Sequence, residues 1–236
     1  MRLDKFISDG AALTRSEARK SIKSGRVRVG QKTEKDIALH IDEGAEVYLD
    51  EKKITYRKHV YIMLNKPAGV VSATEDNFQK TVMDLLDASY SRYQLFPVGR
   101  LDIDTEGFLL LTNDGDIAHN LVSPNKKVGK TYFLRLEKSI SDEDIKKLEK
   151  GVDIGDIVTK EAKAERISEN EINLTITEGK FHQIKRMAKA VGNSVTYLKR
   201  LTYGSLSLDE NLAPGQYREL SEKELEHLYN VYKKNN

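Results

Sequence analysis

The sequence predicts an α+β protein with a small N-terminal domain and a larger second domain. The larger domain is expected to be built on a mixed, mainly antiparallel sheet flanked by helices. Three observations lead to this prediction. The chain has 236 residues, which suits one large domain or two small ones. Its apolar segments are strand-like and linked by turns, without the regular strand–helix alternation of a doubly wound fold. Basic residues gather in the first 35 positions, which carry a net charge of +6 within an overall charge of +2.

Residues 1–54 are predicted to form the small domain. Leu3, Phe6 and Ile7 follow the i, i+3, i+4 spacing of one helical face, and we expect this helix to end at Asp9-Gly10. The segment Thr14-Arg15-Ser16-Glu17 has the pattern of a capping box, which starts a second helix. Alternating segments predict small strands at 26–29 and within 37–54, followed by a polar, basic linker at 55–58.

Residues 59–236 are predicted to form the larger domain. Apolar runs and strict alternation indicate its strands, and capping residues with helical spacing indicate its helices. We expect strands at 60–64, 70–71, on both sides of the loop 99–107, and at 130–136, within 152–177, at 195–201 and 206–208. We expect helices at 81–86, 116–122, 141–150, about 183–191 and after Ser221.

Several classes of function lack support in the composition. There is no cysteine, which excludes disulfides, thiol catalysis and thiolate metal sites and fits a cytoplasmic protein. No apolar run approaches the roughly 18 residues that span a bilayer, and the N-terminus has no apolar signal core. We therefore expect a cytoplasmic location and no membrane partner. Glycine fingerprints of nucleotide cofactors are missing and the five histidines are scattered, so we expect no cofactor and no metal.

The basic N-terminal residues suggest a polyanionic partner. Arg15, Arg19 and Lys23 recur every four residues along one helix, and Arg26 and Arg28 lie on one side of the strand that follows. Charges spread over a surface suit phosphate backbones. Nucleic acid is the commonest partner of such a surface and an anionic membrane is the alternative. The interpretation that needs no ligand is a solvated helix face.

Two carboxylates mark a candidate reactive loop. Asp102 and Asp104 lie between two predicted strands of the stretch 95–115. Rigid elements often hold reactive groups in this way, although aspartates in turns also cap backbone amides. An aspartate can attack a sugar carbon or stabilise a cationic sugar. A nearby cation would keep it ionised, for which Lys185 is a candidate, and Tyr132 could stack on an extruded base.

The segments 2–7, 13–19 and 22–29 resemble the S4 RNA-binding domain. The resemblance is close over about the first thirty residues. One departure is that Val29 runs directly into Gly30, where the family often has an asparagine before the turn glycine. The resemblance implies RNA contacts for the basic residues of this domain, namely Arg2, Lys5, Arg15, Arg19, Lys23, Arg26 and Arg28.

Four motifs of the larger domain agree in order and spacing with one enzyme family. They are Gly99-Arg100-Leu101-Asp102-x-Asp104-Thr105-x-Gly107, Leu64-Asn65-Lys66-Pro67-x-Gly69, Lys130-x-Tyr132, and the stretch 178–187 that contains His182-Gln183-Ile184-Lys185-Arg186. Together they resemble the RsuA/RluB/E/F class of RNA pseudouridine synthases. The resemblance therefore implies isomerisation of a uridine in RNA without a cofactor or metal.

The resemblance also implies residue roles. Asp102 would be the nucleophile, Tyr132 would stack on the flipped base, and Lys185 would pair with Asp102. The residues expected to contact the substrate or shape its site are Arg100, Asp104, Lys66, His182, Gln183 and Arg186. At Glu106 other members often carry a small hydroxyl residue.

The expected substrate is a uridine of 16S rRNA, at the uridine 516 site implied by the RsuA-type resemblance. The expected partner is accordingly ribosomal RNA, as 16S rRNA or a small-subunit assembly particle, and we expect a monomer. A pseudouridine synthase for 23S rRNA is one alternative. A non-catalytic RNA-binding factor for ribosome assembly is another, and the complete set of Asp102, Tyr132 and Lys185 speaks against it.

Overall fold

The computed structural model describes residues 1–11, 13–42 and 44–234, and the chain divides into two compact units. The N-terminal unit contains Met1–Val60 together with the short segment Asp87–Gln94, and the larger unit contains Tyr61–Leu86 and Leu95–Asn236. None of the helices in the described part of the chain combines the length and apolar character needed to cross a bilayer. The α+β class predicted from the sequence is confirmed in both units.

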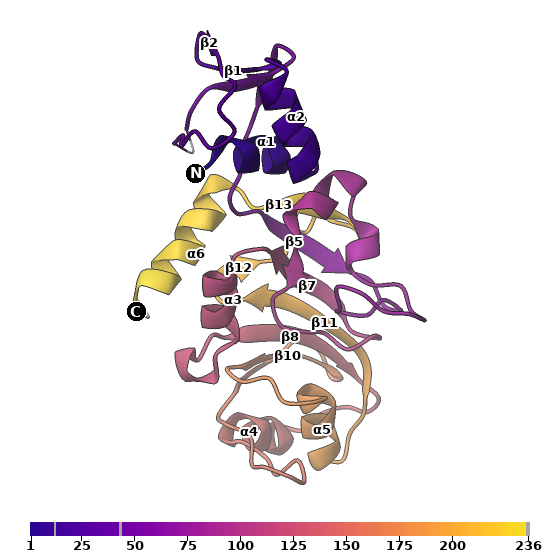
Figure 1. Ribbon diagram of the computed structural model, residues 1–236. Helices are drawn as coiled ribbons and strands as arrows, with labels where there is room; N and C mark the ends of the chain where they lie inside the picture. Colours follow the sequence, from indigo (N-terminus) through magenta and orange to yellow (C-terminus); the bar gives the residue numbers. More distant parts are fainter. Residues whose placement is uncertain (12, 43, 235–236) are drawn as a thin grey trace. The chain divides into compact units, whose positions relative to one another are not determined.

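Two helices and a four-stranded sheet form the N-terminal unit (Figure 1). The capping box is present, because the Thr14 hydroxyl accepts from the Glu17 amide and the Glu17 carboxylate accepts from the Thr14 amide. The core contains Leu3, Phe6 and Ile7, as the helical spacing predicted. The elements are α1 (Leu3–Ala11), α2 (Arg15–Lys23), β1 (Val27–Val29), β2 (Lys32–Thr33), β3 (Val47–Leu49) and β4 (Lys52–Ile54), with strand order β2-β1-β3-β4.

Two details of this unit differ from the prediction. Helix α1 continues through Asp9-Gly10 to Ala11, because Gly10 is needed for packing rather than for a turn: a Cβ there would lie 2.3 Å from Cγ2 of Ile54. Residues 37–41 form no strand, and only an isolated bridge joins His40 to Arg2. The weak alternation there reflects side chains that pack against the core from a loop.

A mixed sheet is the centre of the larger unit, as predicted. Its order is β13-β5-β7-β11-β8-β10-β9, with β6 paired to β7 and β12 paired to β11. The β7–β11 pair is parallel, whereas the other pairs are antiparallel. The strands are β5 (Tyr61–Lys66), β6 (Phe96–Pro97), β7 (Glu106–Thr112), β8 (Lys130–Leu136), β9 (Lys163–Arg166), β10 (Glu171–Ile176), β11 (Val195–Tyr203), β12 (Leu206–Ser207) and β13 (Tyr217–Glu219).

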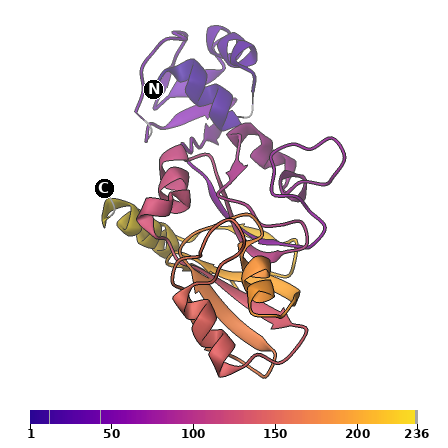
Figure 2. The same cartoon turned by 90° about the horizontal axis from the view of Figure 1, so that it is seen from below.

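Four α-helices accompany this sheet, namely α3 (Gly115–Val122), α4 (Asp142–Lys150), α5 (Gln183–Ala190) and α6 (Glu222–Lys234). Helices α3 and α6 lie side by side (Figures 1 and 2). Side chains of α3 and α6 share a buried apolar cluster with alternate residues of β5 and β7. Helix α4 packs beside β9.

Three predictions for this unit need correction, and one strand was missed. Residues 70–71 form no strand, and Val71 makes only an isolated bridge to Thr81. Residues 81–86 form only the short 3₁₀ helix η1 (Met83–Leu85), because the backbone is already extended at Leu86, with φ of −89° and ψ of 150°. Residues 152–162 form a loop with one isolated bridge rather than a strand. Strand β13 was not predicted, since three residues are too few to show a periodicity.

Gly107 sets how closely β7 and β11 approach. Its φ is +100°, and an added Cβ would lie 2.3 Å from the carbonyl oxygen of Arg200. Only glycine fits both this conformation and this distance. Gly107 is the second residue of β7, directly after the loop that carries Asp102, so it fixes where that loop joins the sheet.

Candidate active site

Lys66, the last residue of β5, binds the backbone of the loop between β6 and β7. The Lys66 side chain is fully buried, and its Nζ donates to the carbonyl oxygens of Pro67, Ile103 and Thr105 at 3.0, 3.3 and 2.9 Å. The expectation that Lys66 contacts the substrate is therefore corrected: its ammonium faces the loop backbone. Burial lowers the pKa of Lys66 to about 8, although the charges of Asp104, Asp102 and Glu106 act in the opposite direction.

Two further backbone contacts fix the same loop. The Ser72 hydroxyl donates to the carbonyl oxygen of Leu101 at 3.0 Å and accepts from the Leu101 amide at 3.1 Å. The Gly69 amide donates to the carbonyl oxygen of Ile103 at 2.7 Å. The residue on each side of Asp102 is thus tied to the segment that follows β5, and the Asp102 side chain starts from a rigid backbone.

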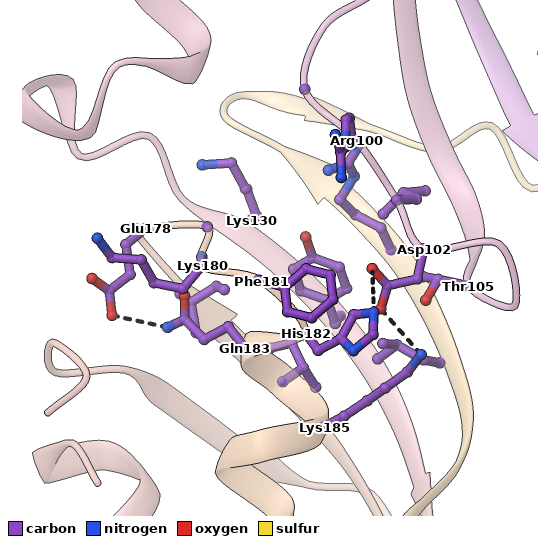
Figure 3. A pocket seen from close by; sticks show the side chains of 18 of the residues that line it. Arg100, Asp102, Thr105, Lys130, Glu178, Lys180, Phe181, His182, Gln183 and Lys185 are labelled. Carbon is purple, nitrogen blue, oxygen red and sulfur yellow. Dashed lines mark hydrogen bonds and ion pairs between the residues drawn. The ribbon is translucent and has the colours of Figure 1, made fainter. Parts of the chain in front are cut away.

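Asp102 faces a cation, as predicted. The Lys185 Nζ, from α5, lies 3.1 Å from Asp102 Oδ2 and 2.6 Å from Asp104 Oδ1 (Figure 3). Burial favours a lower pKa for Lys185, but hydrogen bonds to Asp104 and Asp102 outweigh it and raise the pKa. The hydrogen bond from Lys185 lowers the pKa of Asp104. Asp104 therefore does more than shape the loop, because it also holds the lysine beside Asp102.

His182 approaches Asp102 from the start of α5. Its Nε2 lies 3.7 Å from Asp102 Oδ1, and its backbone is left-handed, with φ of +48°. Figure 3 shows the side chains of His182 and Lys185 both pointing toward Asp102. The exposed ring of Phe181 stacks on the imidazole, with ring centres 3.8 Å apart and planes 21° apart. Sequence reasoning did not select Phe181, although it lies inside a quoted motif.

Gln183 and Arg186 are engaged within the protein. Gln183 is buried, its side-chain nitrogen donates to Glu178 at 2.9 Å, and its side-chain oxygen accepts from the Lys180 amide at 2.9 Å. Arg186 donates from Nε to the carbonyl oxygen of Ile154 at 3.1 Å and forms an ion pair with Asp156. These bonds fix the loops around α5, and Gln183 also lines the cavity beside Asp102. Contact of either side chain with RNA stays a prediction.

A cavity of about 590 Å³ opens beside Asp102. Arg100, His182 and Lys185 line it, as predicted, and so does Tyr132, which is 8% exposed. Its volume suits a nucleotide-sized ligand. Four of the lining residues on the sheet lie in two facing pairs, because Tyr132 of β8 is paired with Arg200 of β11, and Lys130 with Tyr203.

Lys130 and Arg200 give this cavity a positive wall that sequence reasoning did not identify. Arg200 is 1% exposed and donates to the carbonyl oxygen of Phe108 at 2.7 Å. Burial and the charge of Arg200 lower the pKa of Lys130 to about 8. The motif Lys130-x-Tyr132 contained the only sequence signal for this wall. The cavity thus offers a carboxylate, an aromatic ring and several cations, a combination suited to a flipped base on an anionic backbone.

Comparison with known proteins identifies the family. Residues 60–190 match the family model described as RNA pseudouridylate synthase, and residues 1–47 match the S4 domain. The chain belongs to the RNA pseudouridine synthase family. It is therefore an isomerase that acts on RNA, with an N-terminal S4 domain, and the family inferred from its motifs is confirmed.

Several known pseudouridine synthases resemble this chain over nearly its full length. It is 54% identical to an uncharacterized RNA pseudouridine synthase of Bacillus subtilis, with 98% of each chain covered. It is 43% identical to ribosomal small subunit pseudouridine synthase A of Vibrio cholerae, covering 95% of this chain and 98% of the relative. A crystal structure titled pseudouridylate synthase is 36% identical, with a TM-score of 0.68 and 97% and 99% of the two chains covered.

The S4 domain of this pseudouridine synthase is organised around Asp4, which is fully buried. Arg2, Arg15 and Arg19 all pair with its carboxylate, at 3.2, 3.0 and 3.0 Å. Burial alone would raise the pKa of Asp4, but hydrogen bonds from Arg19 and Arg2 and the charge of Arg15 lower it. Sequence analysis predicted the arginines but not the carboxylate that gathers them.

The other predicted RNA contacts of the S4 domain fall into two groups. Arg26 pairs with Asp50, and Arg28 pairs with Glu51 at 3.1 Å. Lys5 and Lys23 are exposed on α1 and α2. Three of the predicted cations thus form ion pairs with Asp4. Arg26 and Arg28 form ion pairs with the two acidic residues of the β3–β4 turn.

Proposed function

We propose that this pseudouridine synthase converts one uridine of 16S rRNA to pseudouridine, at the uridine 516 site expected of RsuA-type enzymes. The observation that carries the proposal is the Asp102–Lys185 ion pair, at 3.1 Å, in the wall of a cavity that also contains Tyr132. Support for the 16S substrate comes from the full-length likeness to relatives named ribosomal small subunit pseudouridine synthase A.

The reaction needs a group that acts on the sugar while the base is released and turned. In the proposal the Asp102 carboxylate acts on the target nucleoside, either by attack at C1′ or by starting an elimination. The N1–C1′ bond breaks, a C5–C1′ bond forms, the C5 proton is lost and N1 gains a proton, so no co-reactant is consumed. Lys185 faces the carboxylate with a positive charge and holds it in place.

Tyr132 is proposed to stack on the flipped uracil. It is buried to 8% exposure, lines the cavity and has the Arg200 guanidinium carbon 6.0 Å from its ring centre. A fixed aromatic ring holds a base through its face without choosing an orientation about the stacking axis. Such a contact suits a reaction in which the uracil must turn before it is rejoined.

The proposal assigns RNA capture to the S4 domain and catalysis to the larger domain. Residues 1–54 form the former, residues 55–58 the linker and residues 59–236 the latter. The partner is 16S rRNA, free or in a small-subunit assembly particle, and the enzyme acts as a monomer in the cytoplasm. Arg2, Lys5, Arg15, Arg19, Lys23, Arg26 and Arg28 supply the contacts of the S4 domain.

The test is to incubate the purified protein with deproteinised 16S rRNA, with 23S rRNA and with small-subunit assembly particles, and to map pseudouridine in each. The expected result is one new pseudouridine, in 16S rRNA. Modification of 23S rRNA alone would replace this proposal by large-subunit specificity. No modification of any of the three RNAs would contradict the proposed ribosomal substrate altogether.

A further inference from the structure

Phe181 is an apolar side chain left in solvent at a cavity lined by charged groups. Its exposed fraction is 70%, and it lies in the loop between β10 and α5 among the residues that line the cavity. Nothing in the proposed chemistry uses it. Most large apolar side chains stabilise a protein by being buried. An aromatic ring that stays exposed beside a binding site therefore indicates contact with a ligand.

The ring is held in one place by its surroundings. It stacks on the imidazole of His182, with ring centres 3.8 Å apart. The Phe181 carbonyl oxygen accepts from Arg186 Nη1 at 3.3 Å, and the amide of the preceding Lys180 donates to Gln183 at 2.9 Å. The loop is thus fixed on both sides of Phe181, so one face of the ring rests on His182 while the side chain stays open to solvent.

The charges around the cavity indicate what the ring meets. Lys180, next in sequence, and Arg100, from the loop that carries Asp102, are exposed cations that line the same cavity. Aromatic rings interleaved with cations are the arrangement by which proteins hold single-stranded nucleic acid, with bases on the rings and phosphates on the cations. The cavity has three such rings, the buried Tyr132 and Tyr203 and the exposed Phe181.

A uridine that enters the cavity leaves its neighbours in the RNA without a stacking partner. We propose that Phe181 is a stacking platform for one of the two nucleobases that flank the target uridine. This inference rests on the proposed function in requiring RNA in the cavity. Because His182 lies between Phe181 and Asp102, the stack of base, Phe181 and His182 closes the cavity on the side of Asp102.

Stacking is tolerant of sequence but requires a base. The test measures kcat/KM, and the affinity for a short RNA fragment that contains the uridine modified by the wild-type enzyme. Phe181→Ala should lower both by about 5-fold or more, the effect of removing one base–aromatic stack. Phe181→Leu should behave like the alanine variant because it lacks a flat ring, and Phe181→Tyr should restore wild-type values. Ile167→Ala, at an exposed apolar residue outside the cavity, should change neither.

The decisive comparison removes the base instead of the ring. Fragments with an abasic nucleotide on the 5′ or the 3′ side of the target should lose affinity for the wild-type enzyme on one side only. On that side Phe181→Ala should cause no further loss. Equal losses for the alanine variant on intact and on both abasic fragments would overturn the proposal, and so would an alanine variant as active as the wild type.

The outcome does not depend on which rRNA is the substrate. If the wild-type enzyme modifies 23S rRNA, the fragment is taken from that RNA and the comparison is unchanged. If it modifies neither, the affinity of a fluorescent single-stranded oligouridine, with and without abasic positions, gives the same comparison by binding alone. Failure of the ribosomal assignment and failure of the stacking platform are therefore separate results.

Discussion

Asp102 has a cation and an imidazole as neighbours. Lys185 Nζ lies 3.1 Å from one oxygen and His182 Nε2 lies 3.7 Å from the other. Both neighbours come from the start of α5, and the backbone on each side of Asp102 is tied down by Ser72 and Gly69. A carboxylate that is held this firmly and remains partly exposed is well placed for the proposed reaction at the sugar.

Asp102→Asn is therefore expected to abolish catalysis. The change keeps the size of the side chain but removes the charge, so pseudouridine formation should fall by roughly 10⁴-fold or more, as when a catalytic nucleophile is lost. Turnover is measured on 16S rRNA, with RNA affinity and the thermal unfolding transition as controls for folding. Retained turnover would show that another group reacts with the sugar.

Lys185 tests the electrostatic part of the site. Lys185→Ala removes the charge that faces Asp102 and Asp104, and we expect the rate to fall by roughly 10²- to 10³-fold, the usual effect of losing one preorganised charged partner. Lys185→Arg keeps the charge and should recover much of this loss. The measurement is the single-turnover rate at saturating enzyme. An alanine variant with an unchanged rate would remove Lys185 from the mechanism.

Among the elements, β5 supports the loop of Asp102 through its last residue. Lys66 joins the end of the strand to the loop of Asp102 by hydrogen bonds to three carbonyl oxygens. Since burial lowers its pKa to about 8 in the folded chain, against about 10.4 in the unfolded chain, the unfolded chain binds more protons between these values. Stability therefore rises with pH across this window.

Lys66→Met should remove that rise. From near pH 7.5 to near pH 9.5 the Lys66 term adds about 2 kcal/mol to the free energy of unfolding. Urea unfolding at both pH values gives the gain for each protein, and the gain of the variant should be smaller by this amount. Other titrating groups contribute equally to both proteins. Parallel pH dependences in the two proteins would show that Lys66 has no depressed pKa.

The contact between β7 and β11 depends on Gly107. Gly107→Ala should destabilise the larger unit by at least about 3 kcal/mol, because the methyl group meets the Arg200 backbone and φ stays positive. Gly115→Ala is the matched control, since a Cβ there has no neighbour within 4 Å. The control should change the free energy of unfolding by less than about 1 kcal/mol. Similar values for the two variants would contradict the role given to Gly107.

Local signals predicted much of this architecture. The capping box at Thr14 and the spacing of Ile184 and Met187 each lie within one element, and both helices are present. Strand β13 and the association of Asp87–Gln94 with the N-terminal unit were not predicted. Both depend on contacts between segments far apart in sequence, where no local period exists.

In the candidate active site, too, side-chain contacts between distant segments were harder to predict than the residues themselves. Asp102 and Lys185 were predicted as a pair, and Lys185 Nζ lies 3.1 Å from Asp102 Oδ2. Lys66 was predicted to touch the substrate from its place in a family motif, yet three carbonyl oxygens hold its ammonium in the interior. A lysine is rarely buried in this way, so the sequence gives little sign of it. Arg200 was missed because only the β8–β11 register places it opposite Tyr132.

At the scale of the whole molecule, the proposal that the S4 domain captures RNA predicts a contribution from its exposed cations. Lys5 and Lys23 are exposed on α1 and α2. Neutralising both, as Lys5→Gln with Lys23→Gln, should lower the magnitude of the slope of log affinity against log salt by about 1.4, from roughly 0.7 per phosphate contact with single-stranded RNA.

The measurement is binding of 16S rRNA by the full chain over a range of salt concentrations. The control replaces two exposed lysines of α4, as Lys146→Gln with Lys150→Gln, and should leave the slope unchanged. Equal slopes for both double variants would mean that the salt dependence arises outside these two positions of the S4 domain.

Asp4 has a consequence for the thermodynamics of RNA capture. Its buried carboxylate restrains Arg2, Arg15 and Arg19, whose side chains still keep 42, 44 and 48% of their surface exposed. A long side chain that becomes immobile during binding loses about 0.5–1.5 kcal/mol of rotamer entropy. Here that ordering takes place when the domain folds, before any RNA is present. In the proposed complex with RNA, the guanidinium groups that Asp4 restrains are therefore already preorganised.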